Sequence, residues 1–283
     1  MGNFKFLIIG SNGLLGSNIV KILKKKKISY YTSARNHSDY NLDLKNFKNL
    51  KKLFLKNNYE IVVNCAAKVN INYCENNYSE AKKINSTFVN FLSNLSKKFH
   101  FKLVHISTDH VYKGKKFRLN NEEGKIYAIN KYAKTKILAE KYVKNYKQNL
   151  IIRTNFTGKK KDSFIDWLIK NIKKNKKIKL FDDMYTSTID VKNCAGLIIK
   201  LAMTNSNGIY NLGTSDMISK KEFAIKVSKI LNKKIFYTTT SIDILKVPRG
   251  KNLGLNVKKI EKKLNLKMIS SNKSIKNNLK EYL

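Results

Sequence analysis

Arginine, proline and acidic residues are scarce in this 283-residue sequence. It contains 1 proline, and its 19 acidic residues stand against 58 basic ones, a formal net charge of +39. Arginine occurs only at positions 35, 118, 153 and 249, which leaves 54 lysines (58 less 4). Because the forked guanidinium of arginine is the group expected where phosphates and bases are bound, its scarcity argues against a specific nucleic-acid binder. The excess of lysine, asparagine and isoleucine is typical of AT-rich coding and predicts a solvated basic surface that attracts anions.

Long apolar runs are also missing. No stretch approaches the roughly 20 apolar residues of a membrane span, and the first residues lack the pattern of a signal peptide. We therefore expect a cytoplasmic protein without a membrane span. Cys65, Cys74 and Cys194 are scattered and have no metal-ligand spacing, which agrees with a reducing compartment. We expect no metal site, and we interpret Asp182 and Asp183 as a loop turn.

What the sequence does contain is an alternation of strand-like and helix-like segments in its first half. The expected strands are FKFLIIG, ISYYTS, EIVVNCAA, FKLVHIS and NLIIRT. Helices are expected from about Leu14, near Phe47 to Leu55, from Ser79 to Lys98 and from Lys131 to Tyr146. Repeated βαβ units of this kind predict an α/β fold of the Rossmann type, a doubly wound parallel sheet with helices on both faces.

The second half is expected to add a smaller region to this sheet. Its elements are the amphipathic helix SFIDWLIKNIKKNKK, the strand IYNLG and the helix SKKEFAIKVSKIL. We predict a dinucleotide-binding Rossmann domain in residues 1–158 and a substrate-binding region in residues 159–283. The two interleave through a returning strand near residues 208–213.

The stretch FLIIGSNGLLG places three glycines between the first strand and the first helix. Without side chains, Gly10 and Gly13 permit a tight turn close to a pyrophosphate, and Gly16 lets the helix pack against the sheet. Free amides at the start of the helix bind the phosphates. The cofactor-binding residues expected in this turn are Gly10, Asn12, Gly13, Leu14, Leu15 and Gly16.

The GxxGxxG spacing resembles that of the extended short-chain dehydrogenase/reductase superfamily. There, a carboxylate at the end of the second strand binds both ribose hydroxyls of NAD, whereas a cation favours the 2′-phosphate of NADP. Here ISYYTS is followed by Arg35, with no acid before Asp39. The resemblance therefore implies NADPH, with NADH as the alternative, and makes residues 1–158 an NADP-binding domain. Further cofactor contacts that it implies are Asp43 and Leu44 beside the adenine and Ala66 and Ala67 beneath the cofactor.

Reduction of a ketone needs a proton donor, and a tyrosine beside a lysine one helical turn away can serve. About three Tyr-x-x-x-Lys matches are expected by chance in so lysine-rich a chain, and four are present, beginning at Tyr78, Tyr112, Tyr127 and Tyr132. Context favours Tyr132 with Lys136, because Tyr132 opens a helix downstream of Thr108, which emerges at the carboxyl edge of the sheet. Tyr127 is the rival.

Two segments resemble the dTDP-4-dehydrorhamnose reductase family, sugar-nucleotide reductases of that superfamily. ISTDHVYKG and INKYAKTKILAE are similar to its S-T-D-Y-V-F-x-G and N-x-Y-G-x-T-K-x-x-x-E segments, with Thr135 and Glu140 in register. Looser matches run along the whole chain: NCAAKVNINYCE, Asn85 in KKINS, IIRTNFTG, DDMYTSTIDVKNCAGLI and RGKNLGLNVKKIEKKL. The resemblance implies NADPH-dependent reduction of the C4 ketone of a nucleotide-linked 4-keto-6-deoxy sugar, as in dTDP-rhamnose and surface polysaccharide biosynthesis.

The same resemblance implies roles for individual residues. Tyr132 would give the proton, Lys136 would bind the nicotinamide ribose and lower the tyrosine pKa, and Thr108 would hydrogen-bond the keto oxygen. The substrate-binding residues that it implies are Thr108, Asp109, His110, Phe156 and Arg249. A homodimer is expected only by analogy with the family.

Departures from the family pattern leave the sugar and the base open. His110 replaces a tyrosine, Gly250 replaces a proline, and the proline-rich lead into the catalytic helix is missing. His110 also argues against a sugar-nucleotide dehydratase, which resembles this chain but has an acid there. Two alternatives remain: a 4-epimerase that would hold NAD tightly, and a regulatory subunit similar to the β subunit of methionine adenosyltransferase. An intact Thr108, Tyr132 and Lys136 disfavours the second. Nucleic-acid binding ranks last, and binding by charge alone would disappear with salt.

Overall fold

The computed structural model describes residues 4–47, 50–114, 118–161 and 163–282. The chain divides into two compact units that interleave along the sequence. The first comprises residues 1–108, 130–153 and 195–210, and the second comprises residues 109–129, 154–194 and 211–283. Each unit thus takes segments from both sides of the predicted boundary at residue 158, and the assignment of binding functions to that boundary stays a prediction.

The central sheet has seven strands in the order β11-β6-β5-β4-β1-β2-β3. Their bounds are β1 (Phe6–Ile9), β2 (Tyr30–Ala34), β3 (Tyr40–Asn41), β4 (Ile61–Asn64), β5 (Lys102–Thr108), β6 (Leu150–Thr154) and β11 (Gly208–Leu212). Parallel pairing of β1 with both β2 and β4, and of β4 with β5, confirms the predicted α/β parallel sheet. Because the chain leaves β1 toward β2 and returns to its other side at β4, the carboxyl ends of β1 and β4 flank the place where ligands bind in such sheets.

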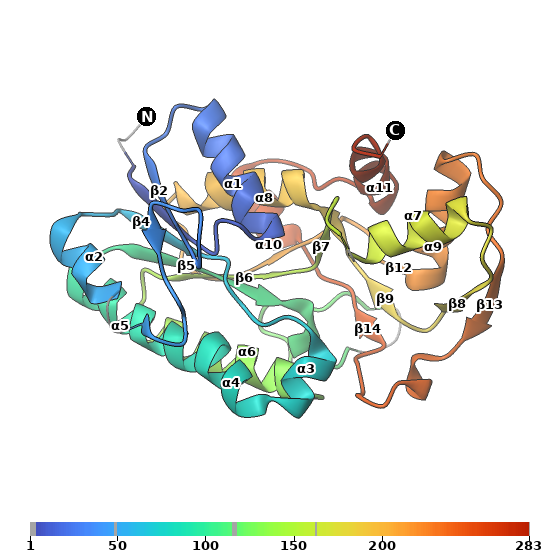
Figure 1. Cartoon of the computed structure of the whole chain (residues 1–283), viewed down its shortest axis with the longest axis horizontal. Coiled ribbons are helices and arrows are strands. Elements are labelled where there is room, and N and C mark those ends of the chain that lie inside the picture. Colours follow the sequence, from blue (N-terminus) through green and yellow to red (C-terminus); the bar gives the residue numbers. More distant parts are fainter. Residues whose placement is uncertain (1–3, 48–49, 115–117, 162, 283) are drawn as a thin grey trace. The chain divides into compact units, whose positions relative to one another are not determined.

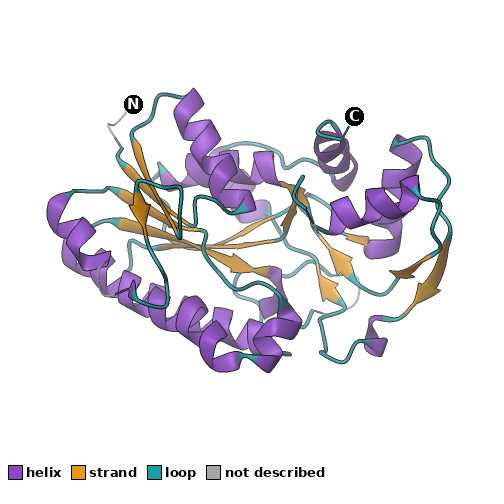
Figure 2. Cartoon of the chain, viewed as in Figure 1, coloured by secondary structure: helices purple, strands orange, loops and turns teal. Residues whose placement is uncertain are grey.

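Helices cover both faces of this sheet, as predicted (Figures 1 and 2). On one face lie α1 (Leu14–Lys25) and α8 (Val191–Ala202); on the other lie α2 (Leu50–Lys56), α5 (Phe88–Phe99) and α6 (Lys131–Lys144). The helix predicted near Phe47 to Leu55 is α2, and residues 48–49 lie outside the described part of the chain.

One prediction about the helices is wrong in detail. The single helix expected from Ser79 to Lys98 is interrupted: α3 (Ile71–Asn76) and α4 (Tyr78–Lys82) lead into a π-helical turn, η2 (Lys83–Thr87), before α5 begins. Hydrophobic spacing does not reveal one residue inserted into a helical turn, and such turns are frequent at functional sites.

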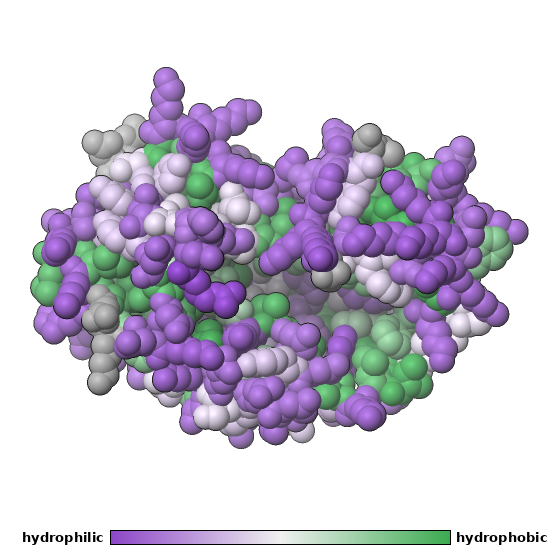
Figure 3. Space-filling model, in the orientation of Figure 1, coloured by the Kyte–Doolittle hydropathy of each residue, from purple (hydrophilic) through white to green (hydrophobic). Residues whose placement is uncertain are grey.

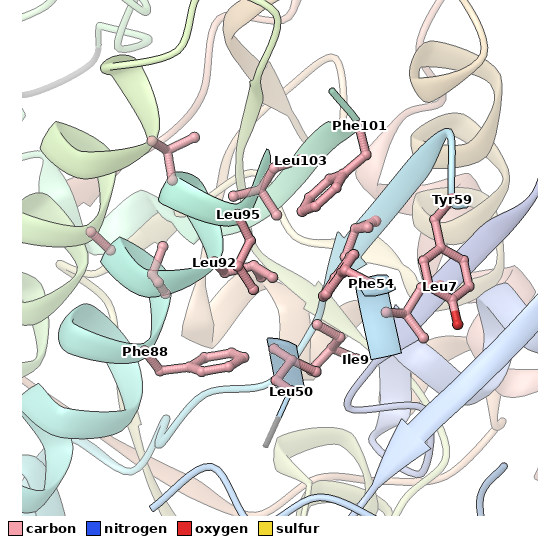
Figure 4. Packing of buried hydrophobic residues seen from close by; sticks show 14 of the residues in the cluster. Leu7, Ile9, Leu50, Phe54, Tyr59, Phe88, Leu92, Leu95, Phe101 and Leu103 are labelled. Atoms are coloured by element: carbon pink, nitrogen blue, oxygen red, sulfur yellow. The ribbon is translucent and has the colours of Figure 1, made fainter. Parts of the chain in front are cut away.

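A large hydrophobic core lies between the sheet and the helices α2, α5 and α6 (Figure 4). Leu7 and Ile9 of β1 and Leu103 of β5 point into it from the sheet. Phe54 of α2 stacks on Phe101 with the ring centroids 4.8 Å apart. Strands buried on both faces need continuous apolar sequences, which is why FLII and IVVN form the centre of the sheet.

The second unit consists of short strands and helices. Its strands are β7 (Phe156–Thr157), β8 (Ile178–Phe181), β9 (Tyr185–Thr186), β10 (Ile189–Asp190), β12 (Ile218–Ser219), β13 (Tyr237–Thr240) and β14 (Asn252–Leu253). Its helices include α7 (Phe164–Lys173), α9 (Lys220–Ile230), α10 (Lys258–Leu264) and α11 (Ser271–Leu279). The predicted helices in 163–177 and 219–231 are α7 and α9, and they share a core through Leu168, Phe223 and Ile275.

Hydrophilic side chains cover much of the face shown in Figure 3. This agrees with a chain in which 58 of 283 residues are lysine or arginine. Among the helices that the structure describes, none is long and apolar enough to cross a lipid bilayer.

Candidate active site

The turn after β1 has the geometry that a bound dinucleotide requires. Gly10 has a φ of +81°, and a Cβ atom there would lie 2.8 Å from the backbone nitrogen of Ala66. At Gly16 a Cβ atom would collide with the carbonyl oxygen of Gly10, because α1 packs directly on the turn. Gly13 is the N-cap of α1 and offers no side-chain hydrogen bond, and the first turn of the helix holds no acid. The amides at this helix start are therefore left for an anion.

The other residues predicted in this turn hold it in place. The Asn12 amide donates a 2.7 Å hydrogen bond to the carbonyl oxygen of Asn36, which ties the glycine turn to the loop after β2. Leu14 is half-buried, and Leu15 is buried in the first turn of α1. Their roles as cofactor contacts stay predictions.

The segment after β2 carries an exposed arginine, and its one carboxylate is already engaged in hydrogen bonds. Asp39 is the only acid in residues 30–42, and its Oδ2 accepts hydrogen bonds from the backbone N–H and the hydroxyl of Thr32, at 2.8 and 2.7 Å. Arg35 is exposed at the end of the strand. A guanidinium without a competing carboxylate suits a phosphate better than a pair of ribose hydroxyls.

The remaining predicted cofactor residues lie in the same unit. Asp43 is exposed, and its Oδ1 accepts a 2.9 Å hydrogen bond from the backbone N–H of Lys45. Leu44 packs on the core below. Ala66 and Ala67 follow Cys65 after the end of β4, and the backbone and side chain of Ala66 pack closely on Gly10.

The first turn of α6 carries Tyr132, with Lys136 one helical turn later on the same face. Asn130 caps this helix, because its Oδ1 accepts a 2.8 Å hydrogen bond from the backbone N–H of Ala133. Only 7% of Tyr132 and 1% of Lys136 are exposed. Thr108, also buried, ends β5 in the same unit.

Tyr127, the rival, has a different environment. It is 51% exposed in a segment without helix, and its backbone N–H donates to the carbonyl oxygen of Val111. Lys131, four residues on, donates to the backbone oxygen of Glu75 at 2.9 Å. The ammonium of Lys113, an exposed residue, lies 5.6 Å from the centroid of the Tyr127 ring, so Tyr127 lacks the buried helical setting of Tyr132.

The other two patterns are also unlike the pair on α6. Tyr112 is buried, but its hydroxyl donates to the carbonyl oxygen of Asn121 at 2.9 Å, and Lys116 lies outside the described residues. Tyr78 and Lys82 share the short helix α4, where Lys82 is exposed. Among the residues described, the pair of Tyr132 and Lys136 is thus the one in which both members are buried on a long helix.

Lys136 reaches under the carboxyl end of β5. Its Nζ donates to the carbonyl oxygen of Ile106 at 2.7 Å and lies 3.0 Å from Nε2 of His105. Burial lowers the pKa of Lys136 to about 8, against smaller opposite effects of Glu140 and Cys65. This lysine can therefore change its charge near neutral pH, which an exposed lysine cannot.

A buried ion pair fixes α6 to the sheet. Arg153 of β6 donates through Nε and Nη2 to the two carboxylate oxygens of Glu140, at 2.9 and 2.6 Å. Ser107 of β5 donates to the same carboxylate at 2.6 Å. Because both charges are paired and hydrogen-bonded, they hold Tyr132 and Lys136 on a rigid element rather than destabilising it.

The π-helical turn η2 holds α6 from the other side. Asn85 donates to the Thr135 hydroxyl at 3.0 Å and also bonds to both backbone groups of Lys68, at 2.8 and 2.9 Å. Ser86 donates to the carbonyl oxygen of Thr135 at 2.8 Å. Two consecutive residues of this widened turn, Asn85 and Ser86, thus both bond to α6.

The second unit contains a cavity of about 730 Å³. Its lining includes Tyr185, Ile242, Leu245, Pro248, Arg249 and Lys251. The Nε of Arg249 is shielded from solvent, and no group among the described residues accepts from it. A guanidinium in this state is suited to an anionic ligand.

Three more of the predicted substrate residues, Asp109, His110 and Phe156, also lie in this unit, whereas Thr108 ends β5 in the first unit. Asp109 is buried, and its Oδ2 accepts a 2.7 Å hydrogen bond from the Asn155 amide. Phe156 is half-buried in β7. Burial lowers the pKa of His110, with Asp109 opposing the change and Arg249 adding to it.

Three residues with functional features did not stand out in the sequence. Asn64 and His105 are direct neighbours on β4 and β5, and the side chain of His105 contacts Lys136. Lys220 begins α9, and burial lowers its pKa to about 8. The apolar pattern of FKLVHIS places His105 on a strand. Its contact with Asn64 depends on the register of β4 on β5, two strands that are far apart in sequence.

Known proteins resemble this chain over most of its length. The family model described as the RmlD substrate binding domain matches residues 4–283. The spore coat polysaccharide biosynthesis protein SpsK of Bacillus subtilis is 26% identical over 225 residues, which is 79% of this chain and 78% of that protein. The dTDP-4-dehydrorhamnose reductase of Aggregatibacter actinomycetemcomitans is 24% identical over 231 residues, 79% and 78% of the two chains.

A solved structure has the same fold. The dTDP-4-dehydrorhamnose reductase of Bacillus anthracis, in complex with NADP, superposes with a TM-score of 0.92. The superposition covers 99% of this chain and 100% of the other, at 24% sequence identity. At this identity the likeness establishes the architecture and leaves the substrate to be tested.

Proposed function

Because this chain belongs to the RmlD substrate binding domain family, we propose that it is an NADPH-dependent reductase of nucleotide-linked sugars. The reaction is reduction of the C4 ketone of a 4-keto-6-deoxy sugar to an alcohol. This is the chemistry that the names of its relatives indicate, and SpsK suggests a use in surface polysaccharide biosynthesis.

The observation that carries the proposal is the buried pair of Tyr132 and Lys136 on α6, in the same unit as the glycine turn of Gly10 to Gly16. A proton donor with a nearby lysine and a built anion site at a helix start are the two parts that a nicotinamide-dependent reductase needs. Neither part is required by the fold itself.

The glycine turn fits a dinucleotide, since Cβ atoms at Gly10 and Gly16 would fill the space that the backbone leaves. The N–H of Gly13 donates to the carbonyl oxygen of Gly10 at 3.0 Å, so the first amides of α1 after it would hold the pyrophosphate, and Arg35 would hold the 2′-phosphate. NADPH supplies a hydride when bound, and the similar Bacillus anthracis reductase is in complex with NADP.

In this proposal, Tyr132 protonates the oxygen that becomes the alcohol. A phenol with an ordinary pKa near 10 is a weak acid at neutral pH, and a positive Lys136 one turn away makes it a stronger one. Lys136 also donates to the nicotinamide ribose, and Thr108 donates to the keto oxygen. Glu140, Arg153 and Asn85 keep the helix that carries the pair in place.

The second unit supplies the contacts to the nucleotide-sugar. Arg249 is the candidate for the diphosphate because its Nε has no acceptor within the described part of the chain. Phe156 offers an apolar face to the sugar, and Asp109 and His110 offer polar contacts. A cavity of about 730 Å³ is in the usual size range for small-molecule sites. A cytoplasmic location and a homodimer remain part of the proposal.

The test is turnover by Tyr132→Phe. NADPH oxidation is followed by absorbance with nucleotide-linked 4-keto-6-deoxy sugars, and NADPH binding is followed by fluorescence. We expect the variant to lose at least about 100-fold in kcat, the contribution typical of a general acid, while its Kd for NADPH stays within about twofold.

Tyr127→Phe is the matched control and should turn over like the original chain. If Tyr127→Phe is inactive and Tyr132→Phe is active, the assignment of the acid is wrong. A purified protein that carries tightly held NAD and interconverts C4 epimers would favour the epimerase. If the protein binds NADPH but oxidises it with none of the sugars, a regulatory subunit would be favoured.

A further inference from the structure

Hydrogen bonds at the end of β4 determine which ring nitrogen of His105 carries a hydrogen. The backbone N–H of Ala66 can only donate, and it donates to Oδ1 of Asn64 at 3.1 Å. This orients the Asn64 amide, so that its Nδ2, which also only donates, lies 3.3 Å from Nδ1 of His105. Nδ1 must accept and therefore carries no hydrogen.

His105 then presents a hydrogen to Lys136. The ring is fully buried, and this burial holds its pKa well below the ordinary value, so it is neutral and carries its hydrogen on Nε2. Nε2 lies 3.0 Å from Nζ of Lys136. An ammonium has no lone pair, so only a neutral amine can accept from Nε2–H. The amine keeps two hydrogens and donates one to the carbonyl oxygen of Ile106 at 2.7 Å.

We propose that His105 is a positioning residue that favours the neutral amine form of Lys136 in the cofactor-free protein, and that NADPH binding is coupled to protonation of Lys136. An ammonium in the same place would require the Nδ1–H form of His105, and that form sets two donors against each other at Asn64. The cofactor step rests on the proposed function; the state of His105 does not.

The other groups around Lys136 do not replace His105 as its partner. On α6, Tyr132 lies one turn before it, and Glu140, one turn after it, is engaged by Arg153 of β6 at 2.9 and 2.6 Å. Glu140 and, more weakly, Cys65 after β4 favour the charged lysine, but less than burial disfavours it. Together these groups offset only part of the hydration free energy that a charged Nζ loses on burial.

NADPH would change this balance. Its phosphates are negative and its ribose oxygens accept hydrogen bonds, so Lys136 gains a proton from solvent when it turns to the ribose. The amine lone pair forms the new N–H bond, and His105 keeps its hydrogen. At pH 9, where the cofactor-free lysine is mostly neutral, the charge that strengthens Tyr132 as an acid thus arises when the reductant is in place.

The ring state of His105 is measured directly by long-range ¹H–¹⁵N spectra of the full chain at pH 9 without cofactor. His105→Gln assigns the signal among the four histidines. We expect a protonated Nε2 and a bare Nδ1. The Nδ1–H form, or a charged ring, would overturn the proposal whether or not the chain is a reductase.

The coupling is measured by titration calorimetry of NADPH at pH 9 in buffers with different ionisation heats. We expect uptake of about one proton per NADPH by the original chain and by the control His100→Asn, and none by Lys136→Met. Asn64→Asp should also lose the uptake, because its carboxylate accepts from Nδ1–H and leaves Nε2 to accept from an ammonium. No uptake by the original chain, or uptake that persists in Lys136→Met, contradicts the coupling.

Discussion

At the scale of single residues, the first unit buries ionisable side chains, although burial removes the water that stabilises their charge. Two different arrangements offset this loss of hydration. Glu140 and Arg153 are 1% exposed and bind each other through two hydrogen bonds. Lys136 is equally buried but forms no ion pair with a carboxylate in the described part of the chain, and burial lowers its pKa to about 8. The first arrangement gives a rigid support, and the second gives a group that can change charge during a reaction.

Arg35 provides a prediction at this scale. If its guanidinium binds the 2′-phosphate, Arg35→Ala should weaken NADPH binding by about 10-fold to 100-fold, the value of one or two charge-assisted hydrogen bonds, and should barely change NADH binding. Fluorescence titration with both cofactors measures this. Lys24→Ala removes the same charge from the far end of α1 and should affect both cofactors little. An equal loss on NADPH and NADH would show that Arg35 does not read the phosphate.

The elements that carry candidate site residues can be predicted where the pattern is local. The three glycines of the turn lie close together in the sequence, and so do Tyr132 and Lys136, so strand and helix periods place each set on its element; their roles in binding and catalysis stay predictions. Asn64 and His105 are 41 residues apart and meet only through the register of β4 on β5. No local pattern encodes that register, and the hydrogen-bond direction at Lys136 could not be predicted.

At the scale of elements, the site depends on how closely helices approach the sheet. α1 touches the glycine turn at Gly16, and η2 widens one turn so that Asn85 and Ser86 both reach α6. These contacts set the distance between the anion site and the pair on α6.

Gly16→Ala tests this packing. Its methyl group would collide with the carbonyl oxygen of Gly10, so α1 must shift, and we expect a loss of about 1–3 kcal/mol in the free energy of unfolding with a clear drop in NADPH affinity. Gly196→Ala in α8 is the control: the nearest atom to its new methyl lies 3.9 Å away, and alanine favours a helix by up to about 1 kcal/mol. Denaturant unfolding measures the free energy of unfolding of both variants, and a loss in Gly16→Ala without a loss in Gly196→Ala would support the close packing of α1. An unchanged Gly16→Ala would show that the close approach is not needed.

Strands and long amphipathic helices follow from the sequence because apolar periodicity reports burial. The prediction did not include α8 (Val191–Ala202): its sequence VKNCAGLIIKLA has an interior glycine and few polar residues. The π-helical turn was missed because nothing in the spacing of Lys83 to Thr87 distinguishes it from regular helix. Both are determined by what they pack against rather than by local preference.

At the scale of the whole molecule, a net charge of +39 is typical of proteins that bind nucleic acids. The fold and the family account for the chain without one, and the charge is carried by lysines that are largely exposed. Such a surface attracts polyanions through its charge alone and does not distinguish one nucleic-acid sequence from another.

We expect binding to duplex DNA to be independent of sequence and to fall by about 10³-fold or more between 50 and 200 mM salt. Fluorescence anisotropy with two unrelated duplexes measures both properties. Binding that prefers one duplex and persists at 200 mM salt would mean that a nucleic-acid site exists beside the reductase site.

Hydride transfer to the C4 ketone of a nucleotide-sugar can be followed directly with NADPH that carries deuterium in place of the transferred hydride. The nucleotide-linked 4-keto-6-deoxy sugar is incubated with the enzyme, and the product is analysed by mass spectrometry and NMR. We expect a reduced sugar with one deuterium at C4 for each NADPH consumed, and none with Tyr132→Phe. An unchanged sugar, or an epimer without deuterium, would contradict this hydride transfer.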